Sequence, residues 1–332
     1  QQTISVVLIA VCTAQLFAWA KIPLAWMLGP LAAGMGWLQV RKQDFYWPTR
    51  WRNWSLLPIG YGMGKYVTAH TLKQIIVQLP GMMVATALML LACYYLARLT
   101  ATGAGLSASS SILGSTPGGL SQMAVLGEEF EDTDLAAITF MQTARLLGVV
   151  CIVPFLVVHG LASDRAPVAA AALATAAAPL GVDGWLAVSL VVVAGAWLAV
   201  KLRWPTPYMM GPVFAIALAS LVHGPLPSLP IAVMNGAQLV MGLYLAKRFR
   251  ASEGSAANWR PLFFFTAIGV LLMIIVSLAL AWGLSSVYHF SLTTAFLAMA
   301  PGGIAEMGLT GIALGEDVSI IFAYQLFRLL FV

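Results

Sequence analysis

Apolar stretches long enough to cross a lipid bilayer recur along the whole chain. A transmembrane helix needs about 20 predominantly apolar residues, and stretches of about that length occur at residues 3–20, 75–96, 135–158, 186–200 and 263–282. The composition agrees, because 61% of the 332 residues are hydrophobic and only 9% are charged. We therefore expect an all-α polytopic membrane protein, with the lipid bilayer as a partner.

The net charge of +5 does not indicate a nucleic-acid partner. The basic residues lie in short loops between apolar stretches, where the positive-inside rule places them. Cys12, Cys93 and Cys151 and the four scattered histidines have no metal-ligand spacing. We see no pair of nucleophile and base either, so we expect no metal, no cofactor and no enzyme activity.

The two halves of the chain repeat one ordered series of residues. Pro23, Trp26, Met27, Gly29 and Pro30 correspond, 182 positions later, to Pro205, Tyr208, Met209, Gly211 and Pro212. The segment Pro117-Gly118-Gly119 returns 184 positions later as Pro301-Gly302-Gly303, and Asp134, Gln142 and Arg145 return 183 positions later as Asp317, Gln325 and Arg328. So nearly constant an offset over more than a hundred residues indicates a duplication.

The duplication divides the chain into a first membrane repeat at 1–160, an Ala-rich linker at 161–182 and a second membrane repeat at 183–332. Each repeat reads as about five transmembrane helices and one Pro-Gly-Gly element. Before that element, helices are expected at 3–20, 23–40, 56–67 and 75–96 in the first repeat and at 185–202, 205–222, 231–246 and 262–284 in the second. A last helix follows Asp134 and Asp317.

The loop charges predict that the two repeats are inverted. If each repeat crosses the membrane an odd number of times, most basic loop residues lie on the same side of the membrane. If each repeat crosses an even number of times, the basic loops of the two halves lie in opposite compartments, which violates the positive-inside rule. The exceptions on the other side are Lys21, Lys65, Lys73 and Arg165. An odd number follows if residues 102–128 form a re-entrant hairpin. The number of crossings is also odd if the broken helix crosses the membrane and another segment is re-entrant. Both arrangements remain open.

Small residues four positions apart occur in the third helix of each repeat, at Gly60 and Gly64 and at Gly242 and Ala246. Such pairs let helices approach closely in lipid. We interpret them as packing positions.

The Pro-Gly-Gly segments predict a broken helix in each repeat. Proline removes a backbone donor and glycine adopts unusual dihedral angles, so one helix should end and another begin there. Irregular backbone at membrane depth survives where it is buried in protein or lines a cavity. The new helix presents free N–H groups, which form an anion site, and two inverted copies would meet near the midplane, as in secondary transporters. The alternative is two proline kinks packed for shape alone.

Each broken element is followed by an arginine within an apolar helix. Arg145 and Arg328 lie eleven residues beyond Asp134 and Asp317, which is about 16 Å into a helix at about 1.5 Å per residue. A charge at that depth is costly and faces a partner or a water-filled path. The alternative to substrate contact is structural, in which each arginine pairs with Glu306 or caps the carbonyls of the broken helix. The two roles are compatible.

The repeats differ at a position next to the break, where Gln122 in the first corresponds to Glu306 in the second. Glu306 is the one carboxylate that we place clearly within the membrane. Glu306 could carry a coupling proton or neutralise an arginine. The expected substrate-binding residues are Ser115, Thr116, Pro117, Gly118, Gly119, Gln122, Gln142, Arg145, Pro301, Gly302, Gly303, Glu306, Gln325 and Arg328.

Three motifs and their second copies resemble the AbrB membrane family, also labelled AbrB duplication, transporter or ammonia monooxygenase. They are Pro-Leu-Ala-Trp-Met-Leu-Gly-Pro at 23–30, Ser-Thr-Pro-Gly-Gly-Leu-Ser-Gln-Met at 115–123 and Met-Gln-x-x-Arg-Leu-Leu at 141–147. The resemblance covers essentially the whole chain. It implies a multi-pass protein of the bacterial inner membrane that acts as a transporter or as a regulator of gene expression. A monooxygenase would need clustered metal ligands, which this sequence lacks.

The function expected is therefore secondary transport of a small organic anion, bound at the midplane between the two broken helices. Proton or sodium coupling and a homo-oligomer are left open, and nucleic acid is not an expected partner. The alternative is a membrane-embedded metabolite sensor that regulates gene expression without transport. Its interaction surface would have to be the basic loops at 41–52 and 247–260.

Overall fold

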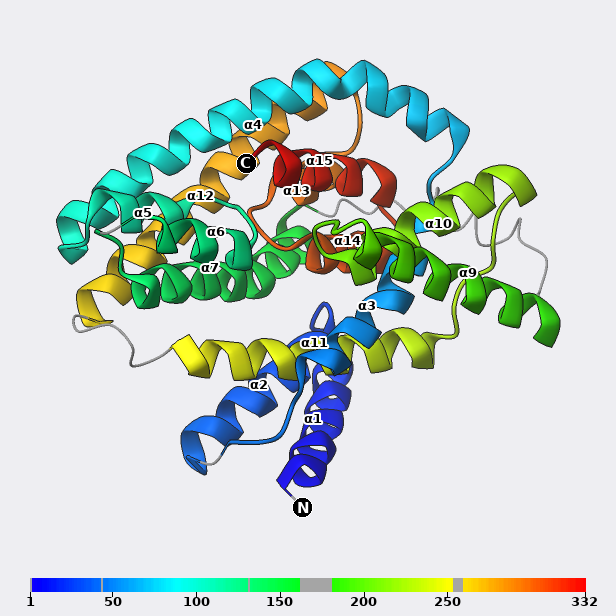
Figure 1. Ribbon diagram of the computed structural model, residues 1–332, viewed down its shortest axis with the longest axis horizontal. Coiled ribbons are helices and arrows are strands. Elements are labelled where there is room, and N and C mark those ends of the chain that lie inside the picture. Colours follow the sequence, from blue (N-terminus) through cyan, green and yellow to red (C-terminus); the bar gives the residue numbers. More distant parts are fainter. Residues whose placement is uncertain (1, 43, 131, 162–180, 253–258) are drawn as a thin grey trace. The chain divides into compact units, whose positions relative to one another are not determined.

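The computed structural model describes residues 2–42, 44–130, 132–161, 181–252 and 259–332, and the regular elements in these ranges are helices (Figure 1). The first half contains α1 (Gln2–Trp19), α2 (Ala25–Val40), α3 (Thr49–Gly64), α4 (Ala69–Ala104), α5 (Ala108–Ser115), α6 (Leu120–Glu128), α7 (Leu135–Leu156) and a short π-helical turn, η1 (Val157–Leu161). The second contains α9 (Val182–Lys201), α10 (Pro207–His223), α11 (Ile231–Ser252), α12 (Trp259–Tyr288), α13 (Leu292–Met299), α14 (Ile304–Leu314) and α15 (Val318–Phe331). Nearly all of the predicted linker at 161–182 lies outside the described residues.

Five helices in the described ranges are long and apolar enough to cross a membrane. They comprise Gln2–Trp19, Ala69–Ala104, Leu135–Leu161, Val182–Lys201 and Arg260–Tyr288. Each coincides almost completely with one of the apolar stretches found in the sequence, which confirms the prediction of an all-helical, membrane-compatible fold.

Several helices extend beyond their expected bounds, among them α4 and α3. α4 has 36 residues and continues through Pro80, where the hydropathy pattern indicated only residues 75–96. Its two extensions carry buried threonines, Thr71 and Thr100, so they pack against protein instead of ending at the limit of the apolar stretch. α3 begins at Thr49, directly after Pro48, and its polar first turns were expected to be loop.

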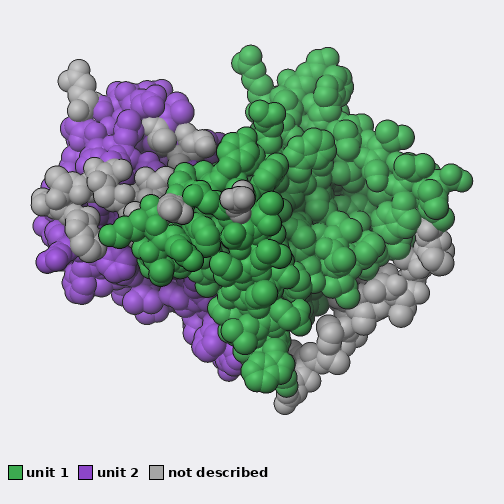
Figure 2. All heavy atoms as spheres, turned by 90° about the horizontal axis from the view of Figure 1, so that it is seen from below, with its two compact units in different colours: residues 1–76, 162–247, 308–322 green, residues 77–161, 248–307, 323–332 purple. Residues whose placement is uncertain are grey.

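The chain folds into two compact units that do not follow the two repeats (Figure 2). Unit 1 consists of residues 1–76, 162–247 and 308–322, and unit 2 consists of residues 77–161, 248–307 and 323–332. Each unit therefore takes segments from both halves of the sequence.

In unit 1 the same glycine contact occurs twice. A Cβ atom on Gly60 of α3 would lie 2.7 Å from the carbonyl oxygen of Met209 in α10, and a Cβ on Gly242 of α11 would meet the carbonyl oxygen of Met27 in α2. Because both members of each pair are shifted by 182 positions, the third helix of each half packs on the second helix of the other. The small residues thus lie at helix contacts, as their spacing predicts.

Alanine at Gly60 or Gly242 is expected to destabilise the protein by about 1 to 3 kcal/mol, because the added methyl group forces two tightly packed helices apart. Gly236 of α11 is the matched control, since its added Cβ would meet nothing within 4 Å. Gly236→Ala should leave stability equal or slightly higher. Thermal unfolding in detergent, followed by circular dichroism, measures the difference. A Gly60→Ala protein as stable as the wild type would contradict the close contact.

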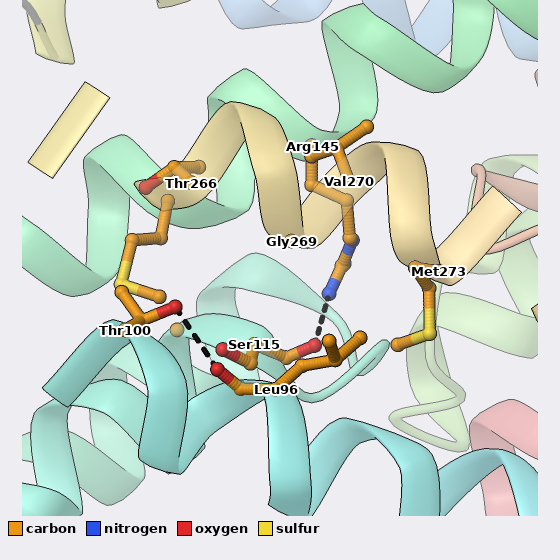
Figure 3. Close-up of a pocket in the computed structure, with 10 residues that line it drawn as sticks. Leu96, Thr100, Ser115, Arg145, Thr266, Gly269, Val270 and Met273 are labelled. Atoms are coloured by element: carbon orange, nitrogen blue, oxygen red, sulfur yellow. Dashed lines mark hydrogen bonds between the residues drawn. The ribbon is translucent and has the colours of Figure 1, made fainter. Parts of the chain in front are cut away.

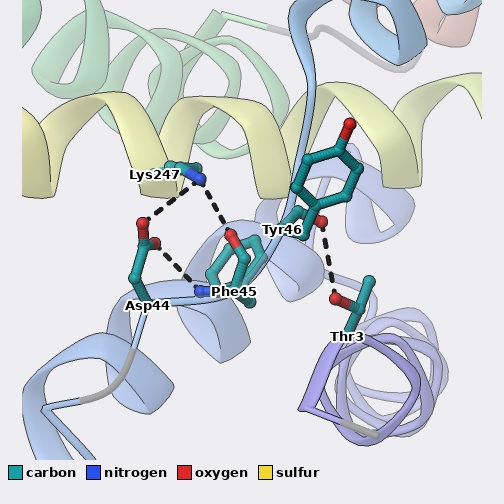
Figure 4. Close-up of polar contacts among 5 residues, drawn as sticks. All are labelled: Thr3, Asp44, Phe45, Tyr46 and Lys247. Carbon is teal, nitrogen blue, oxygen red and sulfur yellow. Dashed lines mark hydrogen bonds and ion pairs between the residues drawn. The ribbon is translucent and has the colours of Figure 1, made fainter.

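Two lysines fix the loops of unit 1. Nζ of Lys247 donates to the carbonyl oxygen of Phe45 at 2.8 Å and lies 3.3 Å from the Asp44 carboxylate, in the loop before α3 (Figure 4). Nζ of Lys65, the corresponding residue of the first half, donates to Oγ of Ser228 at 2.6 Å, in the loop before α11. Each half therefore holds a loop of the other.

Unit 2 is built around α4 and α12, which lie side by side and antiparallel (Figure 1). The contacting positions are Gly81 with Tyr288, Cys93 with Met273 (Sγ to Sδ 3.8 Å) and Gly103 with Phe265.

The two helices bury corresponding faces at an offset of 184 positions. The buried residues Gln78, Met82, Thr86, Met89, Cys93, Ala97 and Thr100 of α4 correspond to Leu262, Thr266, Val270, Met273, Ser277, Ala281 and Leu284 of α12. At several of these pairs one helix has a polar side chain where the other has an apolar one. The buried face of α4 therefore differs in polarity from that of α12.

Candidate functional site

The first Pro-Gly-Gly segment, residues 117–119, separates α5 from α6. α5 ends at Ser115, and Thr116 is extended, with φ −66° and ψ 131°. α6 begins after Gly119, whose N–H donates to Oε1 of Gln122 at 3.3 Å. The last carbonyl groups of α5 therefore have no partner within that helix and need donors from elsewhere.

The donors come from α7 in the first half and from α15 in the second, and an aspartate begins each of these two helices. Oδ1 of Asp134 accepts from the N–H of Ala136 at 2.9 Å at the start of α7, and Oδ1 of Asp317 accepts from the N–H of Ser319 at 3.1 Å at the start of α15. Arg145 lies in the middle of α7, and Arg328 lies in the last turn of α15.

Arg145 and Gln142 bind the carbonyl end of α5. Nη1 of Arg145 donates to the carbonyl oxygens of Thr116 at 2.6 Å and of Ser115 at 3.3 Å. Nε2 of Gln142 donates to Thr116 at 2.9 Å and to Leu113 at 2.6 Å. The two side chains are joined, because Nη2 of Arg145 donates to Oε1 of Gln142 at 2.7 Å.

The second half repeats this arrangement at residues 301–303, between α13 and α14. Nη1 of Arg328 donates to the carbonyl oxygens of Met299 at 3.1 Å and of Ala300 at 3.0 Å, and Nη2 donates to that of Gly302 at 3.2 Å. Gln325 donates to Ala300 at 3.0 Å and accepts from Arg328.

Both arginines thus cap the carbonyl ends of short helices, which is one of the structural roles that the sequence left open. A helix C-terminus carries a partial negative charge, so a guanidinium is stabilised there. In the part of the chain that the structure describes, the hydrogen bonds of Arg145 and Arg328 go to backbone carbonyls and to glutamine, and neither guanidinium forms an ion pair with a carboxylate. Contact with a substrate stays a prediction.

The structure brings the two halves of the site together within unit 2. Arg145 and Arg328 lie near each other and near the buried Cys93. A Cβ on Gly302 would lie 3.0 Å from Cγ1 of Val149, one helical turn beyond Arg145. The second Pro-Gly-Gly segment therefore packs against the helix that carries the first arginine.

Glu306 lies over the Pro-Gly-Gly segment of its own half. Its carboxylate occupies the space that a Cβ on Gly303 would take, just as the amide of Gln122 lies against Gly119. The environments differ, because the Glu306 side chain is 3% exposed and that of Gln122 is exposed. This charged difference between the two Pro-Gly-Gly elements is thus buried.

A small cavity adjoins Arg145, between α4, α7 and α12 (Figure 3). Its volume of about 20 Å³ holds about one water molecule. Thr100, Thr266 and Met273 line it, and the sequence did not single them out. Alignment of α4 with α12 at the offset of 184 positions pairs Thr266 with the apolar residue Met82. This difference in polarity between the halves is the sequence signal that could have identified Thr266.

In the described ranges, no group of three or more histidine, cysteine, aspartate and glutamate side chains is placed to hold a metal ion. Cys12, Cys93 and Cys151 are free thiols.

A family model described as "Transition state regulatory protein AbrB" matches residues 26–332. Two relatives align with 94% of the chain. One is the "Uncharacterized protein YhjN" of Bacillus subtilis (strain 168), 25% identical over 334 residues that make up 85% of that protein. The other is the "Putative regulator AbrB" of Escherichia coli (strain K12), 25% identical over 313 residues that make up 88% of that protein.

Proposed function

Because this chain belongs to the AbrB family, and because two buried arginines hold the carbonyl groups before its Pro-Gly-Gly segments, we propose that it is a secondary transporter for a small organic anion. We place it in the bacterial inner membrane. Its two repeats are inverted, each contains a helix broken at Pro-Gly-Gly, and the anion binds near the bilayer midplane between the two broken helices.

The observation that carries this proposal is the pair of guanidinium groups inside unit 2. Arg145 is 9% exposed and Arg328 is 5% exposed. A charged side chain within an apolar helix is costly and is retained where it serves a partner or a pathway. Two such cations close together, hydrogen-bonded to dipoles rather than to carboxylates, keep a positive potential that attracts an anion.

The N-termini of α6 and α14 are the direct contacts that we propose for the substrate. Free N–H groups at a helix start bind carboxylates, and Ser115, Thr116 and Gln122 lie beside them in the first half. The arginines hold the carbonyl ends of α5 and α13 and so fix where α6 and α14 begin. The cavity of about 20 Å³ beside Arg145 is too small for an organic anion, so it is not the substrate site that we propose.

The inversion is supported by contacts that occur twice with their partners exchanged. In unit 1 the pairs Gly60–Met209 and Gly242–Met27 are related by 182 positions. In unit 2, α4 and α12 are antiparallel and bury corresponding faces. A pseudo-two-fold relation between the halves explains both. Glu306 breaks that relation, and we propose that it carries the coupling proton. Sodium coupling is the alternative.

Regulation of gene expression is the second candidate function. The description of the family model and the name of the Escherichia coli relative both refer to a regulator. Such a protein would use the same site to sense a metabolite and would bind it without transport. The two functions therefore share a ligand class and differ in flux.

Proteoliposomes separate these functions. The purified chain is reconstituted, and uptake of radiolabelled acetate, lactate and succinate is compared with that of protein-free vesicles, while binding of the same anions is measured by thermal unfolding in detergent. We expect at least one anion to be both bound and taken up. Binding without uptake would establish the sensor instead, and neither binding nor uptake of small carboxylates would refute the proposed substrate class.

A further inference from the structure

A groove on unit 1 is lined by corresponding faces of α3 and α11. Its volume is about 260 Å³, close to the lower end of the roughly 300 to 1,000 Å³ of small-molecule sites. Apart from Trp51, each lining residue of α3 corresponds to a lining residue of α11, 182 positions later. These pairs are Trp54 and Gly236, Ser55 and Ala237, and Pro58 and Val240. The groove is thus shared between the two halves.

A contact between α3 and α11 lies about one helical turn beyond each end of the groove, and the two contacts differ in polarity. At one end the guanidinium of Arg52 lies over the ring of Tyr244, 5.4 Å from its centroid. The corresponding residues at the other end are Met234 and Gly62, where a Cβ on the glycine would lie 2.9 Å from Cε of Met234. One end is therefore cationic and the other apolar, which suits an amphipathic ligand.

The Arg52 guanidinium has no carboxylate partner among the described residues. Nη1 donates to Oδ1 of Asn53 at 3.5 Å, which is a weak hydrogen bond, and Nε makes none. The carboxylate nearest in sequence, that of Asp44, lies 3.3 Å from Nζ of Lys247 instead. A guanidinium presents its N–H donors in a planar fork that matches a phosphate group. The charge at this end of the groove therefore favours an anionic phosphate.

The cationic end of the groove has the residues of a membrane–water boundary. Trp51 and Trp54 are exposed, and exposed tryptophans gather at the level of the lipid headgroups. Exposed basic side chains occur in the same segment, at Arg41, Lys42 and Arg50. The positive-inside rule places such a segment on the cytoplasmic side. Anionic lipids of the cytoplasmic leaflet bind at basic pockets between helices.

We propose that this groove binds one anionic phospholipid of the cytoplasmic leaflet, with its phosphate on Arg52 and one acyl chain along the groove towards Met234. A Cβ on Gly236 would meet nothing within 4 Å, so this glycine leaves room for the chain. A small soluble anion would leave the apolar end unused, and a lipid without net charge would leave the guanidinium unneutralised. The site shares no residue with the proposed site of the organic anion and does not depend on transport.

Binding of defined lipids to the purified, delipidated chain in detergent tests the site. Dioleoyl-phosphatidylglycerol and dioleoyl-phosphatidylcholine have the same acyl chains and differ in net charge, and native mass spectrometry counts the molecules bound at each concentration. We expect one phosphatidylglycerol per chain to bind about ten-fold more tightly than phosphatidylcholine, because the phosphate accepts hydrogen bonds from a charged group. Arg52→Gln should remove this preference. Gly236→Leu fills the groove and should weaken the binding of both lipids.

Arg50→Gln is the matched control, because it removes the same charge from an exposed side chain two residues away that does not line the groove. The preference should then change by about two-fold or less. Equal affinity of the wild type for the two lipids, or a preference that Arg52→Gln retains, overturns the proposal. A dimer that Gly236→Leu separates, with no lipid bound, would assign the groove to a second copy of the chain. If Arg52→Gln does not fold, the wild-type preference and its loss in Gly236→Leu decide.

Discussion

Replacing Arg328 with methionine is expected to destabilise the protein by about 2 to 4 kcal/mol. The side chain donates to three backbone carbonyls, and Gln325 shares only that of Ala300. The variant leaves the carbonyls of Met299 and Gly302 without their side-chain donor, at about 1 to 3 kcal/mol each. Loss of the buried charge offsets part of this cost.

Two further variants separate the contribution of the several guanidinium N–H donors from that of the positive charge. Arg328→Lys keeps the cation at the end of α13 but cannot reach all three carbonyls, so it should lose about half as much stability. Arg98→Met changes an exposed arginine of α4 and should shift stability by no more than about half a kcal/mol. Thermal unfolding in detergent measures all three. Equal stability of Arg328→Met and Arg98→Met would show that the carbonyl contacts do not hold the second Pro-Gly-Gly segment.

Glu306→Gln is expected to abolish proton-driven accumulation of the substrate while the fold remains. The first half shows why the fold tolerates the change, since Gln122 occupies the corresponding position and its amide lies against Gly119. Glutamine cannot take up and release a proton, so a pH gradient should no longer drive uptake. The accumulation ratio should fall about ten-fold or more, which corresponds to about 1.4 kcal/mol.

Exchange of labelled for unlabelled substrate across proteoliposomes without a gradient is the internal control, and it should persist in Glu306→Gln. Gln122→Glu adds a carboxylate at the exposed position and should not change the pH dependence. Accumulation in Glu306→Gln that still follows the pH gradient would exclude this residue as the proton carrier and leave sodium as the candidate coupling ion.

The sequence predicts most helices because their determinants are local. The apolar stretches set the five long helices, and proline with paired glycines lies where α5 and α13 have ended. The lengths of α3 and α4 were underestimated, since their polar turns are stabilised by contacts far away in sequence. The two units could not be foreseen for the same reason, because each combines helices of both halves.

The arginines were recognised as unusual, but their partners were not. Every residue has a main-chain carbonyl group, so the sequence does not show that those of Thr116 and Ala300 accept hydrogen bonds from the arginines. Cys93 was set aside because no metal ligand lies near it in sequence, yet it lies near both arginines in space. Thr266 was missed because one hydroxyl in an apolar helix usually bonds to its own backbone.

The central claim is that the arginines beside the two Pro-Gly-Gly segments serve anion transport. Uptake of radiolabelled acetate, lactate and succinate into proteoliposomes tests it most directly when the wild type is compared with the double variant Arg145→Lys/Arg328→Lys and with Arg98→Lys, all shown to be folded. We predict saturable uptake by the wild type and by Arg98→Lys, and a loss of about ten-fold or more in the double variant. Saturable uptake that is unchanged in the folded double variant would contradict the claim.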